Sequence, residues 1–159
     1  EPAKPTSADD LTAVVVTPSA DRVGIRVSPY GGSVGMSAQG DADHEALYGY
    51  LAQQLGALGL VYIHVVDHSS MGSPTVAATV KAAIRERFRG AYILSGGYDA
   101  VRAQQDLDDG RGELVAYGRP FIANPRLVTK LREGKALRSP DPATFYAPGP
   151  EGYVDYPLD

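Results

Sequence analysis

Four short apolar stretches, each followed by a segment with helical periodicity, set the pattern of this chain. They cover residues 23–28, 60–66, 91–95 and 113–117. The first alternates apolar and polar positions, as a strand does, and the second is apolar almost throughout, as expected of a parallel strand buried on both faces. Regular alternation of strands and helices predicts parallel strands with right-handed crossovers. Both a doubly wound sheet and a β/α barrel satisfy this pattern.

The first two helices are predicted from apolar stripes at helical spacing. Asp41 or Asp43 is expected to cap the first helix, and Ser73-Pro74 reads as the N-cap and first helical position of the second. The stripes are Leu47, Leu51, Leu55 and Leu58 in the first helix, and Val76, Val80, Ile84 and Phe88 in the second. These positions are the predicted contacts between the helices and the sheet.

The last two helices are predicted mainly from their caps. Asp99 is a candidate N-cap for a helix over residues 100–107. Asn124 is the predicted N-cap of a helix over residues 125–132, with Pro125 at its first position, and Gly134 marks the end of that helix.

The chain divides into three segments. Residues 1–20 form an N-terminal arm whose structure the pattern leaves open, residues 21–139 carry the four βα units, and residues 140–159 form a tail rich in proline, glycine and aromatic side chains. We expect the tail to pack as an ordered loop and not as a regular element.

Composition narrows the classes of function. The 159 residues carry a net charge of −4 and no basic run that would neutralise a phosphate backbone, which argues against nucleic acid as a partner. Cysteine is absent, which excludes disulfides, thiolate metal sites and thiol catalysis. No signal pattern or membrane-length apolar stretch is found, so we expect a soluble, cytoplasmic protein without a membrane partner.

Three of the predicted strands lead into loops with features suited to a ligand. Arg26 lies inside the first strand and needs either a core carboxylate or an anionic ligand. Gly96 and Gly97 follow the third strand. Gly118 and Arg119 follow the fourth, where a flexible backbone and a guanidinium fork suit a phosphate, although a tight turn with a surface arginine also fits.

Two further features are weaker indications of a catalytic site. His64, in the middle of an apolar strand, reads as a core or pocket-lining histidine more readily than as a catalyst. Asp67, His68 and Ser69 resemble the composition of a hydrolase triad, but adjacent residues point in different directions and triads are assembled from separated segments. A hydrolase therefore ranks far behind the other interpretations.

The placement of the glycine-containing loops favours the barrel. Phosphate binding by the last two consecutive βα loops is common in β/α barrels. The sequence contains neither a Gly-x-Gly-x-x-Gly fingerprint nor a Walker sequence, which would have favoured the other nucleotide-binding folds. We therefore predict an α/β protein with half of a TIM-type (β/α)₈ barrel.

Several motifs then resemble those of one family. They are Gly24-Ile25-Arg26-Val27-Ser28-Pro29-Tyr30-Gly31, Glu86-Arg87-Phe88, Ser95-Gly96-Gly97-Tyr98, Leu114-Val115-Ala116-Tyr117-Gly118-Arg119-Pro120-Phe121-Ile122-Ala123-Asn124-Pro125, Thr144-Phe145-Tyr146 and Glu151-Gly152-Tyr153-Val154-Asp155-Tyr156-Pro157. In order and approximate spacing they resemble the old yellow enzyme family, FMN-dependent NAD(P)H ene-reductases with the β/α barrel fold. The resemblance runs from about Asp21 to the C-terminus and corresponds to the C-terminal half of the barrel, strands 5–8.

The resemblance implies roles for individual residues. Arg26 is similar to the family's strand-five arginine, which lies against the flavin ring. Gly96 and Gly97 are similar to the backbone donors after strand seven, and Gly118 with Arg119 to the strand-eight pair, which together hold the FMN phosphate. The aromatic that borders the substrate pocket corresponds to Tyr146. The resemblance implies that FMN is reduced by NAD(P)H and then transfers hydride to an activated alkene such as an enone.

The resemblance also implies what this chain needs from elsewhere. The family's substrate-binding His-Asn or His-His pair, its proton-donating tyrosine, and the threonine and glutamine that contact flavin belong to the first half and are not found here. No catalytic residue is therefore assigned. An open half-barrel has two free edges and an exposed inner face, so we expect it to pair with something. The candidates are a complementary half-barrel from another chain, a second copy, or the rest of an intact barrel of which this is a portion. The alternative is a catalytically inactive half-barrel that serves as a binding or assembly module.

Overall fold

The computed structural model describes residues 19–31 and 43–158. The chain divides into two compact units, Glu1–Val115 and Ala116–Asp159. The N-terminal arm up to residue 18 and the candidate cap Asp41 lie outside the described residues.

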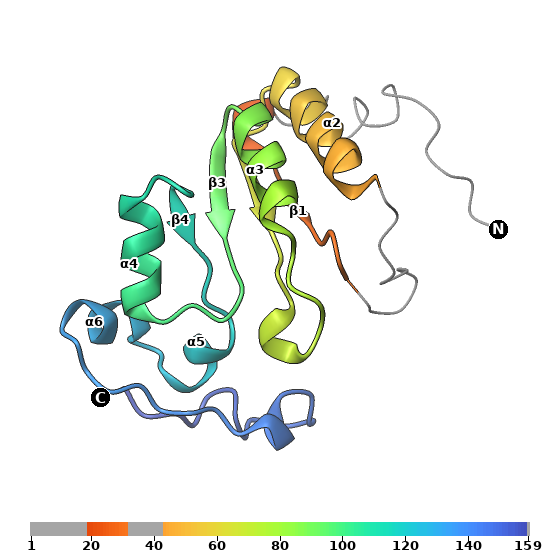
Figure 1. The fold of residues 1–159 in the computed structure, drawn as a ribbon. Helices are drawn as coiled ribbons and strands as arrows, with labels where there is room; N and C mark the ends of the chain where they lie inside the picture. The colour runs from red at the N-terminus through yellow and green to blue at the C-terminus, as the bar shows by residue number, and fades with distance from the viewer. Residues whose placement is uncertain (1–18, 32–42, 159) are drawn as a thin grey trace. The chain divides into compact units, whose positions relative to one another are not determined.

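The first unit is built on a four-stranded parallel sheet (Figure 1). The strands are β1 (Gly24–Val27), β2 (Tyr62–Val65), β3 (Ala91–Leu94) and β4 (Leu114–Val115), and they pair in sequence order. This confirms the predicted parallel α/β arrangement, with strands slightly shorter than the apolar stretches.

One face of the sheet is buried. Ile63 and Val65 on β2 and Tyr92 on β3 are almost completely buried on this face. Helices α2 (His44–Ala57) and α3 (Ala78–Arg87) pack against each other beside these strands, and α4 (Ala100–Asp108) follows β3 (Figure 1). The core of the unit therefore lies between the sheet and the crossover helices.

The opposite face carries a row of aligned side chains. Arg26 is the register partner of His64, which pairs with Ile93, and Ile93 pairs with Leu114. Arg26 is exposed and Leu114 is 52% exposed. Since successive residues of a strand point to opposite faces, this row lies on the face that α2 and α3 do not cover. The two ends of the row, Arg26 and Leu114, are therefore open, whereas His64 and Ile93 between them are half-buried.

The predicted start of α3 is wrong, although its apolar stripe is correct. The helix begins at Ala78, because the chain through Ser73-Pro74 is occupied by a turn in which the Ser73 amide donates to the His68 carbonyl. Short 3₁₀ turns, η2 (Ser69–Met71) and η1 (Ala20–Arg22), precede α3 and β1. Val76 and Phe88 are nevertheless buried outside the helix ends.

The predicted stripe of α2 is only partly correct. Leu55 is buried as expected, whereas Leu47 is 57% exposed. The buried face of α2 runs through Gly49, Ala52 and Leu55, where small residues allow close packing with α3. Asp43 occupies the N-cap position without a side-chain capping bond.

The second unit contains two short helices, α5 (Arg119–Ala123) and α6 (Leu127–Arg132), and the 3₁₀ turn η3 (Pro142–Thr144) in the tail. The predicted capping role of Asn124 is wrong, because α6 starts after Arg126 and Asn124 ends α5. Asn124 is fully buried, and its amide donates to the carbonyls of Pro120 and Arg138 at 2.8 Å each. It therefore joins α5 to the segment after α6.

Two broader findings bear on function. No helix among the described residues is long and apolar enough to cross a membrane. Among residues 19–31 and 43–158, no group of three or more His, Asp or Glu side chains could hold a metal ion.

Candidate functional site

The loop after β3 is shaped by two glycines. Gly96 has φ +129° and Gly97 has φ +66°, conformations that residues with a side chain rarely adopt. A Cβ on Gly96 would lie 3.0 Å from the Asp67 Cβ, and one on Gly97 would lie 2.7 Å from the Ser70 Cβ. Glycine is therefore required at both positions, and the loop presents its backbone at the carboxyl end of the sheet, where ligands bind in α/β folds.

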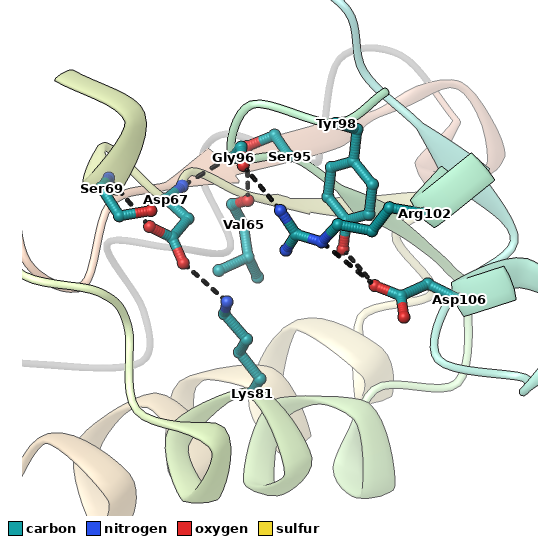
Figure 2. A network of polar contacts seen from close by, with 9 residues as sticks. All are labelled: Val65, Asp67, Ser69, Lys81, Ser95, Gly96, Tyr98, Arg102 and Asp106. Atoms are coloured by element: carbon teal, nitrogen blue, oxygen red, sulfur yellow. Dashed lines mark hydrogen bonds and ion pairs between the residues drawn. The ribbon is translucent and has the colours of Figure 1, made fainter. Parts of the chain in front are cut away.

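The carboxyl ends of β2 and β3 are joined by Ser95. Its Oγ donates to the Val65 carbonyl at 2.9 Å and accepts from the Asp67 amide at 3.4 Å (Figure 2). These two contacts fix the start of the glycine loop against the end of the neighbouring strand.

Asp67, which follows β2, is bound to helix α3. Lys81 Nζ lies 2.6 Å from its Oδ2, and the Ser69 amide donates to Oδ1 at 3.0 Å (Figure 2). Burial opposes ionisation of Asp67, but these hydrogen bonds and the Lys81 charge outweigh it and lower its pKa. Among the described residues no hydrogen bond joins Asp67 to His68. The carboxylate therefore stabilises a loop and does not orient a catalytic histidine.

Helix α4 holds the glycine loop from the other side. The Arg102 guanidinium donates to the Gly96 carbonyl at 3.1 Å and lies 4.0 Å from the centre of the Tyr98 ring (Figure 2). Asp106 accepts the Tyr98 hydroxyl at 2.7 Å and lies 4.0 Å from Arg102 Nε. Burial, together with Asp106, raises the pKa of Tyr98 to about 12, so its hydroxyl remains a donor at neutral pH. The confirmed cap Asp99, which accepts from the Arg102 amide at 2.8 Å, fixes the start of this helix.

Arg26 and His64 lie side by side on the uncovered face of the sheet. Among residues 19–31 and 43–158 no ion pair joins Arg26 to a carboxylate. Burial, and then the Arg26 charge, lowers the pKa of His64, which keeps the imidazole neutral at pH 7. Its Nε2 is buried without a hydrogen bond in the part of the chain described, as is the Ser28 hydroxyl at the end of β1.

The remaining predicted site residues belong to the second unit. Gly118 is the N-cap of α5 with φ −99°, and open space surrounds the position of its absent side chain. Arg119 is the first residue of α5 and is exposed. Tyr146 in the tail is 97% exposed. The structure thus brings Arg26 and the Gly96-Gly97 loop into one unit, and Gly118, Arg119 and Tyr146 into the other.

Sequence reasoning missed the residues that support the glycine loop. Lys81 lies 14 positions from Asp67, and nothing in the sequence pairs them. The Arg102–Asp106 pair at i and i+4 was a readable signal, because this spacing places two side chains on one helix face.

Comparison with known proteins identifies the family. The model of the NADH:flavin oxidoreductase / NADH oxidase family matches residues 9–138. The chain belongs to the old yellow enzyme family. This confirms the resemblance, and with it the assignment of the sheet to part of a TIM-type barrel.

Individual old yellow enzyme relatives agree. A 12-oxophytodienoate reductase 1 from Oryza sativa subsp. japonica is 38% identical over 153 residues, which cover 93% of this chain and 39% of the relative. A chanoclavine-I aldehyde reductase from Penicillium roqueforti (strain FM164) is 39% identical over 151 residues, covering 91% and 40%. The chain thus spans about two fifths of the length of the curated relatives it matches.

Solved structures support the same assignment. Morphinone reductase in complex with tetrahydroNAD has a TM-score of 0.80 and 41% identity, covering 94% of this chain and 39% of that protein. The old yellow enzyme from Trypanosoma cruzi has a TM-score of 0.80 and 33% identity, covering 96% and 41%.

Proposed function

We propose that this chain binds FMN and contributes to an NAD(P)H-dependent reduction of activated alkenes. The observation that carries the proposal is the Gly96-Gly97 loop, whose backbone is held at the carboxyl end of the sheet in a conformation that admits no side chain. Backbone amides in such a loop suit the phosphate of a cofactor. The family assignment, with relatives that include several oxophytodienoate reductases, supports flavin as that cofactor.

Arg26 is proposed to lie against the flavin ring. It is a cation without a carboxylate partner among the described residues, and two buried polar atoms without partners, His64 Nε2 and Ser28 Oγ, belong to the same pair of strands. Such orphaned groups fit the edge of a polar ligand better than they fit a closed core. The neutral imidazole of His64 adds no second positive charge, and the Arg26 guanidinium itself would favour the anionic reduced ring.

Arg119 and Gly118 are proposed as further phosphate ligands, and Tyr146 as a border of the substrate pocket. This part rests on the resemblance and on position in the sequence, since Gly118-Arg119 follows β4 as Gly96-Gly97 follows β3. When bound, FMN would accept hydride from NAD(P)H and pass it to the β-carbon of an alkene such as an enone. A cytoplasmic location is part of this proposal.

A titration of the purified protein with FMN tests the proposal. We expect quenching of flavin fluorescence on binding, and weaker binding for Arg119→Ala by about tenfold or more, the usual scale for loss of a charged hydrogen bond. Arg126→Ala is the matched control, because Arg126 is exposed in the same unit and is not a proposed ligand. Absence of binding by the wild-type protein, or equal binding by both variants, would contradict the assignment.

Pairing of the sheet is the second element of the proposal. The uncovered face exposes Leu114 and part of the Tyr62 ring beside Arg26, and such a face favours a covering partner. We propose a complementary half-barrel or a second copy as that partner, and a protein that pairs without binding flavin would be a binding or assembly module. Native mass spectrometry with and without FMN separates these cases, because only the flavoprotein would gain the mass of the cofactor.

A further inference from the structure

We infer that Arg102 is a positioning residue that turns the Gly97 N–H toward an anion and strengthens it as a donor. The inference rests on the proposed function, because it assigns that anion to the FMN phosphate. It concerns a side chain on α4 that lies behind the glycine loop and does not itself need to touch the cofactor.

The geometry of one peptide group carries the inference. The Gly96 carbonyl and the Gly97 N–H belong to the same peptide, and no cis peptide occurs among the described residues. In a planar trans peptide these two groups point in opposite directions. Because Arg102 Nη1 holds the Gly96 carbonyl at 3.1 Å, it also fixes the direction of the Gly97 N–H, which faces away from α4.

The same contact changes the strength of the donor. A cationic donor on the carbonyl polarises the peptide and makes its N–H a better hydrogen-bond donor. Both glycines have positive φ, so this peptide has more rotational freedom than an ordinary one when nothing holds it. Arg102 therefore supplies both orientation and polarisation.

Arg102 is itself held in place, as a positioning residue must be. It is 48% exposed, and a lone arginine with that exposure would be free to leave the carbonyl. The Tyr98 ring lies under its guanidinium, and Asp106 links the two by accepting the Tyr98 hydroxyl at 2.7 Å. Arg111 Nε lies 3.4 Å from the other oxygen of Asp106 and orders that carboxylate.

The nearby carboxylate of Asp67 does not oppose anion binding at this loop. Its side chain is close to Gly96, but Lys81 lies 2.6 Å from its Oδ2 and offsets its charge. With Asp67 neutralised by α3, Arg102 on α4 supplies the positive charge closest to the Gly96-Gly97 peptide in Figure 2.

The test compares FMN with riboflavin, which has the same ring and lacks the phosphate. For Arg102→Gln we expect FMN affinity to fall by about tenfold and riboflavin affinity to remain unchanged, the scale being that of one charge-assisted hydrogen bond. Arg102→Lys should recover part of the loss. Arg89→Gln removes an exposed arginine of the same unit away from the loop and should affect neither ligand.

A second readout follows the Gly97 amide resonance in the ¹⁵N-labelled protein without flavin. Titration with inorganic phosphate should shift this resonance in the wild type and in Arg89→Gln, and not in Arg102→Gln. Equal losses for FMN and riboflavin in Arg102→Gln would overturn the inference, as would a Gly97 resonance that responds equally in both variants. If the wild type binds neither flavin, the proposed function is refuted, and the phosphate titration alone decides whether Arg102 orients the donor.

Discussion

Replacing Gly97 by alanine separates backbone strain from steric contact, because the chain offers a matched glycine. Gly97 has φ +66° and Gly110 has φ +69°, and both belong to the first unit. A Cβ on Gly97 would lie 2.7 Å from the Ser70 Cβ, whereas one on Gly110 would meet nothing within 4 Å. The two substitutions therefore share the conformational cost and differ in the contact.

The expected magnitudes follow from these two parts. An alanine held in the left-handed region costs about 1 kcal/mol or slightly more, which is the whole expected effect of Gly110→Ala. The contact with Ser70 adds about 1 to 3 kcal/mol, the usual cost of overpacking, so Gly97→Ala should destabilise by about 2 to 4 kcal/mol. Ser70 is part of η2, and relief of the contact requires that this turn or the glycine loop shift.

Urea denaturation of the two variants measures the free energies of unfolding. Ser70→Gly removes the Cβ that Gly97→Ala would meet. The double variant should therefore recover the free energy lost to this contact and keep only the cost of the left-handed backbone conformation. Equal destabilisation by Gly97→Ala and Gly110→Ala, or no coupling between positions 70 and 97, would refute the reasoning. FMN affinity measured on the same samples should fall for Gly97→Ala and remain unchanged for Gly110→Ala.

Two further predictions concern buried polar groups. Asn124→Ala should lower the free energy of unfolding, measured in a urea titration, by about 3 to 5 kcal/mol, because buried backbone groups of Pro120 and Arg138 lose their partners. Asn124→Asp keeps the side-chain volume but places an oxygen against two carbonyls, so it should not restore the lost stability. The pKa of Asp67 is lower in the folded chain than its ordinary 3.8, so its ion pair with Lys81 stabilises the fold above pH 3.8, and this contribution is lost as the pH falls through the folded-state pKa. Asp67→Asn should therefore show a smaller loss of stability than the wild type between about pH 6 and about pH 3, and equal losses would contradict the role of the pair.

The sheet and one helix cap were predictable because their signals are local. Apolar stretches bounded by glycine and polar residues gave four strands, and Asp99 has the side chain and position that an N-cap needs. The start of α3 was not predictable in the same way. Ser73-Pro74 satisfies the local rule for a helix start, but the preceding turn, in which the Ser73 amide donates to the His68 carbonyl, runs up to this point and the helix begins only at Ala78.

Asn124 shows a second reason why local rules fail. Asparagine before proline is a good cap by propensity, yet here its amide satisfies backbone groups 4 and 14 residues away. The residues around the glycine loop were missed for the same reason. Ser95, Asp67 and Arg102 act through contacts between different elements, and only the fold brings these partners together.

The support of the glycine loop has a consequence for how a βα unit tunes a ligand site. The loop is held from two crossover helices, by Lys81 of α3 through Asp67 and by Arg102 of α4 through the Gly96 carbonyl. The first contact is an ion pair whose two charges offset each other, so its main effect is to hold the loop in place. The second places a half-exposed cation on the peptide that carries the proposed donor, so its effect is also electrostatic. Loss of the whole Asp67–Lys81 pair, which leaves no unpaired charge beside the loop, should therefore act on stability and on both flavins alike, whereas loss of Arg102 should act on phosphate binding alone. This difference distinguishes contacts that build the loop from a residue that sets its affinity.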